Sequence, residues 1–172
     1  MAIFIWDEEW LVPEGEDVVL GAQRLHCIVL KEFRRDNIIK FANSELAENS
    51  INAFKPWITQ QDSLTLVGHN IITADLEVNR RLLDIPFTIG RDSINGKPCT
   101  FIDTFTLSKR LNPDRPMAYY RGKSCGQHGL KAWGIRTGVA KPEVDDWTSQ
   151  PLEVYLHRCT EDVINNEATY EM

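Results

Sequence analysis

Two acids at the end of an apolar run form the first candidate site of the chain. Asp7 and Glu9 follow Ile3–Trp6, four apolar residues that favour a buried strand. Because successive side chains of a strand point to opposite faces, Asp7 and Glu9 share one face and Glu8 points away. Neighbouring carboxylates repel each other unless a cation lies between them, and Mg²⁺ and Mn²⁺ prefer hard oxygen ligands. The stretch is therefore either a divalent-metal site or, more simply, a strand that reaches water at Asp7.

Two further acids and a histidine occupy comparable positions later in the chain. Asp75 lies just past an apolar strand, in the first turn of the next helix, and Asp162 lies on the last helix, one turn beyond His157. Sites in open α/β sheets form where strands end beside helix starts, so these acids could meet Asp7 and Glu9. Taken singly, Asp75 could only complement a helix dipole, and Asp162 could belong to a solvated helix face. Their joint spacing favours a shared site.

Hydrophobic patterns predict the elements that would position these acids. After the first strand, strands are predicted over Leu25–Leu30, Asn37–Ala42, Leu64–Asn70 and Thr100–Asp103. Helices are predicted over Ser44–Gln60 (with Ser44 as N-cap), Thr73–Leu83, Phe105–Leu111, Gly129–Thr137 and Pro151–Tyr170, and loops over Asn112–Gly126 and Lys141–Gln150. Short polar connections between the first three strands indicate an antiparallel meander, and the later alternation of strands and helices indicates a mixed α/β sheet. No repeat is present, so we expect one compact domain over residues 1–172.

Composition narrows the class of protein. At 172 residues with 42% hydrophobic content, the chain suits one well-buried domain. The net charge of −6 argues against a broad surface that coats nucleic acid. A nuclease is not excluded, because an acidic metal pocket adds negative charge by itself. No apolar run approaches the length of a membrane span, and the scattered cysteines without a CxxC pair favour reduced thiols and a cytoplasmic protein.

The combined motifs resemble a known nuclease family. The pattern is Asp7-x-Glu9, then His69-Asn70-x₄-Asp75, then His157-x₄-Asp162. It resembles the three motifs of the DEDD-type 3′→5′ exonucleases, and specifically the DEDDh subgroup, in which a histidine stands five residues before the final aspartate. The resemblance covers nearly the whole chain. It implies a ribonuclease H-like exonuclease fold, with a mixed five-stranded sheet whose first three strands are antiparallel and which is flanked by helices.

A second resemblance lies in the middle of the chain. Three segments are similar to the exonuclease domain of phage family A DNA polymerases: Leu25-His26-Cys27, Cys99–Lys109 (CTFIDTFTLSK) and Gly126–Gly138 (GQHGLKAWGIRTG). Those domains usually carry a tyrosine four residues before the last aspartate, where this chain has Arg158. The chain also has a few more residues between Asp7 and His26 than those relatives. A phage-encoded protein would act in the cytoplasm of the host cell.

The resemblance implies a reaction and a role for each motif residue. The reaction is hydrolysis of the terminal phosphodiester at the 3′ end of single-stranded DNA, which releases nucleoside monophosphates with the help of two divalent ions, Mg²⁺ or Mn²⁺. Asp7, Glu9 and Asp162 would hold one ion. Asp7 would also bridge to the second ion, which Asp75 would hold through water. An imidazole titrates at ~6.5, so His157 could take the proton of the attacking water as general base.

Residues outside the motifs are expected to hold the strand by stacking and by positive charge. These substrate contacts are Trp10, Leu11, Asn70, Tyr119, Tyr120 and Arg121. The first two directly follow the carboxylates and could wedge against the last bases, and the asparagine could reach the sugar or the backbone. The last three lie in a long basic loop, for which an ordinary solvated connection is an equal alternative.

Two other functions stay open on the sequence. The same chemistry could act on RNA or short oligonucleotides, because the sequence does not show which sugar edge is read. Alternatively, the chain could be a catalytically silent module that binds nucleic acid or a polymerase. Arg158 supports this alternative, since a cation beside the acids could occupy a metal position, whereas the intact set of four carboxylates opposes it. A proofreading role beside a DNA polymerase also stays open, and the chain is either a free-standing exonuclease or a piece of a longer protein.

Overall fold

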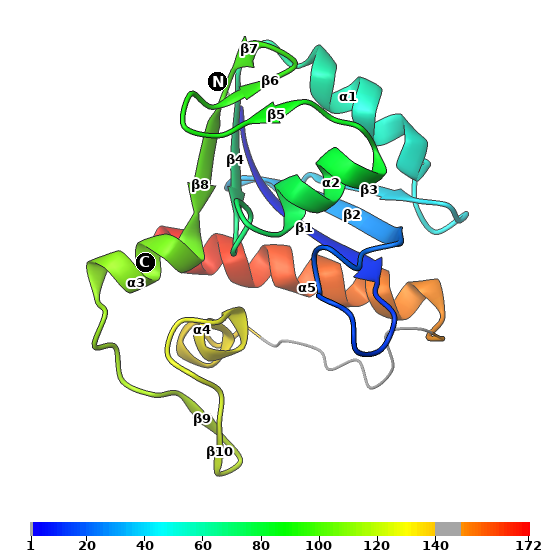
Figure 1. The fold of residues 1–172 in the computed structure, drawn as a ribbon. Coiled ribbons are helices and arrows are strands. Elements are labelled where there is room, and N and C mark those ends of the chain that lie inside the picture. The colour runs from blue at the N-terminus through cyan, green and yellow to red at the C-terminus, as the bar shows by residue number, and fades with distance from the viewer. Residues whose placement is uncertain (1, 140–148) are drawn as a thin grey trace.

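The structure, a computed structural model, describes residues 2–139 and 149–172 and has a five-stranded mixed sheet at its centre (Figure 1). The strands are β1 (Ala2–Leu11), β2 (Arg24–Glu32), β3 (Ile38–Ala42), β4 (Leu64–Gly68) and β8 (Thr100–Asp103). They lie in the order β3-β2-β1-β4-β8. β1, β2 and β3 pair antiparallel, whereas β4 pairs parallel with both β1 and β8. This arrangement confirms the predicted sheet, including its antiparallel first three strands.

Helices flank this sheet (Figure 1). They are η1 (Ile51–Ala53, a 3₁₀ turn), α1 (Phe54–Gln60), α2 (Asp75–Leu82), α3 (Thr104–Leu111), α4 (Leu130–Thr137) and α5 (Leu152–Glu171). Two small additional sheets consist of β5 (Phe87–Thr88), β6 (Ser93–Ile94) and β7 (Lys97–Pro98), and of β9 (Tyr119–Tyr120) and β10 (Lys123–Ser124). The 20-residue α5 runs along one face of the central sheet, and α1 and α2 lie over the other.

The alternation of side chains along β1 divides the apolar core into two layers. Trp6 packs in the cluster that includes α1 and α2, whereas Ile5 packs in the cluster that includes α5. By the same alternation, Asp7 and Glu9 lie on the α5 face and Glu8 lies on the α2 face. The predicted separation of the three consecutive acids is therefore confirmed.

The first strand is longer than the sequence indicated. It was expected to end at the acids, but β1 continues to Leu11 because Trp10 and Leu11 still pair with β2. Asp7 and Glu9 therefore lie within the strand rather than at its end, and both are half-buried. The pairing slips by one residue after Glu9, where β2 carries a β-bulge.

The helix predicted from Ser44 is wrong in its first half. The helical segment begins at Ile51 and becomes α-helical at Phe54, and Leu46, expected on the apolar face, is exposed. Pro56 gives the physical reason, because proline lacks a backbone donor and is tolerated only in the first turn of a helix. A helix from Ser44 would hold Pro56 in its interior, whereas in α1 it is the third residue.

The remaining predicted strands and helices are present. The loop predicted over Asn112–Gly126 contains the β9–β10 hairpin, which projects beyond α4 (Figure 1). Of the loop predicted over Lys141–Gln150, residues 141–148 lie outside the described residues. In the two described ranges, no helix combines the length and the apolar character that a membrane span requires.

A close contact between α4 and α5 fixes the helix that carries Asp162. Asn165 of α5 is fully buried and donates a hydrogen bond from its amide to the carbonyl oxygen of Leu130 at 2.9 Å. Gly134 faces α5 at this contact, because a Cβ there would be 3.0 Å from Nδ2 of Asn165 on α5, and it would also be 2.7 Å from the carbonyl oxygen of Val139, just past the end of α4. Only glycine leaves room for this approach.

We therefore expect Gly134→Ala to destabilise the fold by about 1–3 kcal/mol, the usual effect of overpacking. For a chain of this size that corresponds to a fall in melting temperature of roughly 2–4 °C per kcal/mol. Gly129→Ala is the matched control, because a Cβ at Gly129 would meet nothing within 4 Å. Thermal unfolding followed by circular dichroism measures both variants. Equal melting temperatures for the two variants would contradict the close contact.

Candidate metal centre

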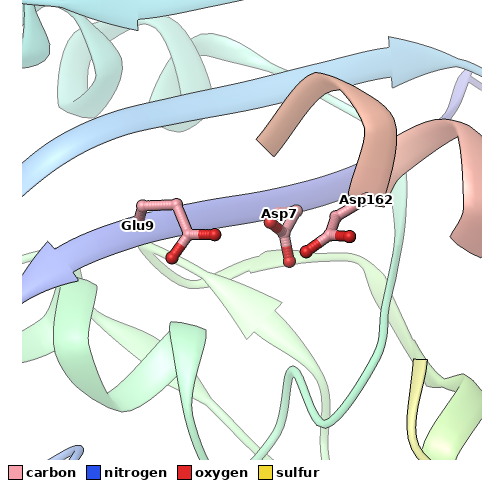
Figure 2. A group of neighbouring side chains, drawn as sticks. All are labelled: Asp7, Glu9 and Asp162. Carbon is pink, nitrogen blue, oxygen red and sulfur yellow. The ribbon is translucent and has the colours of Figure 1, made fainter. Parts of the chain in front are cut away.

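Three carboxylates from distant parts of the chain meet on the α5 face of the sheet. Asp7 and Glu9 come from β1 and Asp162 comes from α5, and one oxygen of each lies within 4.8 Å of the others. Figure 2 shows the carboxyl groups of Asp7 and Asp162 side by side, with Glu9 further along β1. Asp7 and Glu9 are half-buried and Asp162 is buried. The structure thus brings together three of the four predicted carboxylates.

Arg158 lies against this carboxylate group. Its Nε is 3.1 Å from Oδ2 of Asp162 and 3.9 Å from Oε1 of Glu9, and its side chain is only 13% exposed. The i,i+4 spacing on α5 places Arg158 one turn before Asp162, so the helix itself brings the pair together. The guanidinium offsets part of the repulsion among the acids. Arg158, which stands where the phage polymerase domains usually have a tyrosine, thus supplies positive charge to the site.

The donor set fits a divalent cation. All three converging groups are carboxylates, the hard oxygen donors that Mg²⁺ and Mn²⁺ prefer. Three ionised carboxylates carry three negative charges, of which the Arg158 guanidinium balances one. A divalent ion held by Asp7, Glu9 and Asp162 would compete with that guanidinium for the same oxygens.

Asp75, the fourth predicted carboxylate, lies with Glu8 on the α2 face of the sheet. It is buried at the start of α2, and burial together with the charge of Asp103 raises its pKa to about 8. Burial and the charge of Asp75 also raise the pKa of Glu8 well above its usual range, an effect that a hydrogen bond from Asn79 partly offsets. Asp75 is therefore outside the three-carboxylate group, and its role as a water-mediated ligand stays a prediction.

Asp103 organises the loop between β4 and α2, which the sequence did not indicate. It caps the N-terminus of α3 by accepting a hydrogen bond from the Thr106 amide at 3.0 Å. The same carboxylate accepts hydrogen bonds from the backbone amides of Asn70 at 3.2 Å and Ile72 at 3.3 Å. An aspartate directly before a helix is a recognisable N-cap signal. Its reach to a loop more than thirty residues away has no local signal.

His69 has a structural role, as predicted. Its Nδ1 lies 2.9 Å from the hydroxyl of Thr104, which donates a hydrogen bond to Oδ1 of Asn166 at 2.7 Å. Asn166 lies on α5 one turn beyond Asp162. This chain of polar groups, in which Thr104 and Asn166 are buried, links the end of β4 to the helix that carries Asp162.

His157, the predicted general base, is exposed on α5. It stands five residues before Asp162, and the next residue, Arg158, makes the contact with the carboxylates. The assignment of His157 as base stays a prediction.

The predicted substrate contacts near the carboxylates are partly used within the fold. Trp10 packs against the core on the α2 face, and its indole donates a hydrogen bond to the carbonyl oxygen of Val18 at 2.7 Å. Leu11 ends β1 and is half-buried. Asn70 adopts a left-handed backbone conformation (φ 69°), and its amide oxygen accepts a hydrogen bond from the hydroxyl of Thr73.

The other predicted contacts lie in the β9–β10 hairpin. Tyr119 and Tyr120 are 62% and 50% exposed, and the Arg121 guanidinium lies 5.2 Å from the ring centre of Tyr120. The hairpin lies beyond α4 and away from β1 and α5 (Figure 1). The structure therefore separates this aromatic and basic tip from the carboxylate group.

The fold is shared with solved structures of other proteins. Over 99% of its length the chain is similar to a family B DNA polymerase from the archaeon Pyrobaculum calidifontis, with a TM-score of 0.65 and 12% identity, and it spans 24% of that chain. It is also similar to the EXO domain of Nibbler from Aedes aegypti, with a TM-score of 0.54 and 15% identity, over 99% of this chain and 80% of that one. No protein-family model and no curated protein sequence matches it. The chain therefore has the ribonuclease H-like exonuclease fold.

Replacing Arg158 with alanine is expected to tighten the binding of Mn²⁺ about tenfold or more. The variant removes a positive charge about 4 Å from the ligand oxygens, where unit charges interact by several kcal/mol at intermediate dielectric. Calorimetric titration of the metal-free proteins with MnCl₂ measures the change. Arg35→Ala, which breaks the exposed ion pair of Arg35 with Glu32, is the control. Unchanged or weaker Mn²⁺ affinity in Arg158→Ala would show that the guanidinium does not compete with the metal.

Replacing Asp75 with asparagine is expected to stabilise the metal-free protein at alkaline pH. Folding raises the pKa of the Asp75 carboxyl, so the folded protein tolerates its protonated form best. The contribution of this group to stability is therefore full below the unfolded-state pKa of ~4 and is lost as the pH rises through the folded-state pKa of about 8. Urea unfolding in EDTA at pH 5, 7 and 9 should therefore show a smaller loss of stability in Asp75→Asn than in wild type.

The exposed carboxyl of Asp84 provides the control for this comparison. Asp84→Asn should follow the wild-type pH dependence. Parallel pH profiles for Asp75→Asn and wild type would show that Asp75 ionises as readily in the folded chain as in the unfolded one.

Proposed function

We propose that the chain is a single metal-dependent 3′→5′ exonuclease domain over residues 1–172 that degrades single-stranded DNA from its 3′ end to nucleoside monophosphates. The observation that carries the proposal is the convergence of Asp7, Glu9 and Asp162 on a fold shared with exonuclease domains. Phosphodiester hydrolysis needs charge stabilisation and a positioned water, and a cluster of carboxylates on a sheet supplies both through bound cations.

Each motif residue has a role in this proposal. When bound, two divalent ions, Mg²⁺ or Mn²⁺, supply an activated water and stabilise the leaving oxygen. Asp7, Glu9 and Asp162 would hold the ions, and Asp75, at the start of α2, would contribute through water. His157, which is exposed and can reach solvent, takes the proton of the attacking water.

The substrate contacts of the proposal fall in two places. Near the carboxylates, Trp10, Leu11 and Asn70 contact the last nucleotides of the strand. In the hairpin, Tyr119 and Tyr120 offer exposed rings for base stacking, and Arg121 offers a cation for the backbone. Their separation beyond α4 suits a strand of several nucleotides rather than a dinucleotide.

A second function is favoured by one observation. The ion pair of Arg158 with Asp162 at 3.1 Å places a cation among the ligand oxygens, as a catalytically silent module that binds nucleic acid or a polymerase could retain. In such a module the guanidinium would replace the metal permanently. In the exonuclease it is displaced or shared when metal binds.

The decisive assay follows a 5′-labelled single-stranded DNA oligonucleotide with Mg²⁺, with Mn²⁺ and with EDTA, beside a matched RNA strand. We expect a ladder that shortens from the 3′ end, requires metal and is reduced at least 100-fold in Asp7→Asn, because that substitution removes a ligand charge while it keeps the shape. His157→Ala should lower the rate by about 10²–10⁴-fold, the usual contribution of a general base.

Each other outcome has a distinct meaning. Full activity in His157→Ala would move the general base elsewhere. Cleavage of RNA alone would change the substrate to RNA and keep the chemistry. If both strands stay intact with either metal while the oligonucleotide still binds, the silent module replaces the exonuclease.

A further inference from the structure

A cavity of about 260 Å³ lies between β2 and the start of α5, outside the residues assigned above. Its walls are Arg24, Leu25, His26, Asn43, Gln150, Leu152 and Tyr155. Its volume is slightly below the roughly 300 Å³ at which typical ligand sites begin, so it suits only a small ligand, such as one nucleobase with its sugar phosphate. Aromatic, amide and guanidinium groups line it together.

A β-bulge gives the cavity its aromatic wall. Glu9 pairs with Cys27 and Trp10 pairs with Leu25, so His26 is an extra residue in β2. Such a bulge re-aims side chains, and here it turns His26 toward α5, the side to which Cys27 also points. The imidazole stacks on the ring of Tyr155 with centroids 4.0 Å apart and an interplanar angle of 3°. Tyr155 covers one face of the buried imidazole, and nucleobases stack on aromatic rings of this kind.

Arg24 and Asn43 bring hydrogen-bond donors to the cavity. Arg24 is exposed, and within residues 2–139 and 149–172 it forms no ion pair. The Oδ1 of Asn43 accepts a hydrogen bond from the backbone amide of Ile51, so the NH₂ group of Asn43 is not engaged in that hydrogen bond. A guanidinium that lacks a carboxylate partner binds phosphate oxygens well, and an amide group can pair with a base edge.

The cavity adjoins the carboxylate group along both elements that form it. On the sheet, His26 is next to Cys27, the cross-strand partner of Glu9. On α5, Tyr155 lies one turn before Arg158, a rise of about 4.5 Å. A strand whose phosphate lies at the carboxylates can therefore place its neighbouring nucleotide in the cavity, on the Glu9 side.

We propose that this cavity binds one nucleoside monophosphate unit, with the base stacked on His26 and the phosphate held by Arg24. The inference rests on the proposed exonuclease function, since it assigns a binding site beside the same carboxylates. The unit is either a nucleotide of the bound strand or the mononucleotide released from it, and both share the same chemistry.

Binding in EDTA tests the proposal without catalysis. Thymidine 5′-monophosphate and a single-stranded octathymidylate are titrated by calorimetry against the Asp7→Asn protein and against the same protein with Arg24→Gln. We expect Arg24→Gln to weaken the mononucleotide at least tenfold. Arg91→Gln is the matched control, because Arg91 is also exposed but lies outside the cavity. His26→Ala should also weaken the binding of the mononucleotide. If His26→Ala does not fold, the result for Arg24→Gln alone tests the proposal.

The outcomes separate the two sources and the two proposals. If Arg24→Gln weakens the binding of both ligands, the cavity holds a nucleotide of the bound strand. If it weakens the binding of the mononucleotide alone, the cavity holds the released product. Equal binding by Arg24→Gln and Arg91→Gln, or no binding of either ligand in EDTA, overturns the inference. If the wild type cleaves no nucleic acid but binds the mononucleotide through Arg24, the exonuclease proposal fails and the nucleotide site stands.

Discussion

Electrostatic repulsion among Asp7, Glu9 and Asp162 is the constraint on which the rest of the structure depends. Acids from β1 and α5 can stay within 4.8 Å of one another only if α5 is held firmly on the sheet. The buried side chains between α5 and the strands provide most of that attraction, at about 1.5–3 kcal/mol for each large apolar residue. At the far end of α5, the ion pair of Lys31 with Glu167 at 2.6 Å is largely shielded from water and adds a directional tie.

The same strand shows two ways of accommodating buried acids. On the α5 face, Arg158 offsets the charge of the carboxylates. On the α2 face, burial raises the pKa of both Glu8 and Asp75, and the charge of a neighbouring acid raises each further, Asp75 for Glu8 and Asp103 for Asp75, so both are best tolerated in the protonated form. Hydrophobic residues would stabilise both places better, so the acids are more easily explained by a function than by the fold.

The sequence predicted the sheet well because its strands are short apolar runs with clear ends. It also predicted that Asp7 and Glu9 share a face, since side-chain alternation in a strand depends on nothing distant. The grouping with Asp162 came from motif spacing, because no local rule says which helix lies over which strand. Three tertiary features were not predicted. They are the pairing that extends β1, the hydrogen bonds of Asp103 to the loop at Asn70 and the bulge at His26. Each depends on contacts between segments far apart in the sequence.

One feature of α5 could have been found from the sequence and unites the site with the cavity. Tyr155, Arg158 and Asp162 stand at i, i+3 and i+7, the spacing of one stripe along a helix. Across the stripe, the strands present His26, then Glu9, then Asp7 in the same order, as the contacts of each pair show. The facing elements therefore form a line of aromatic, cationic and acidic groups. A linear series of this kind matches a linear ligand whose bases and phosphates repeat at regular intervals.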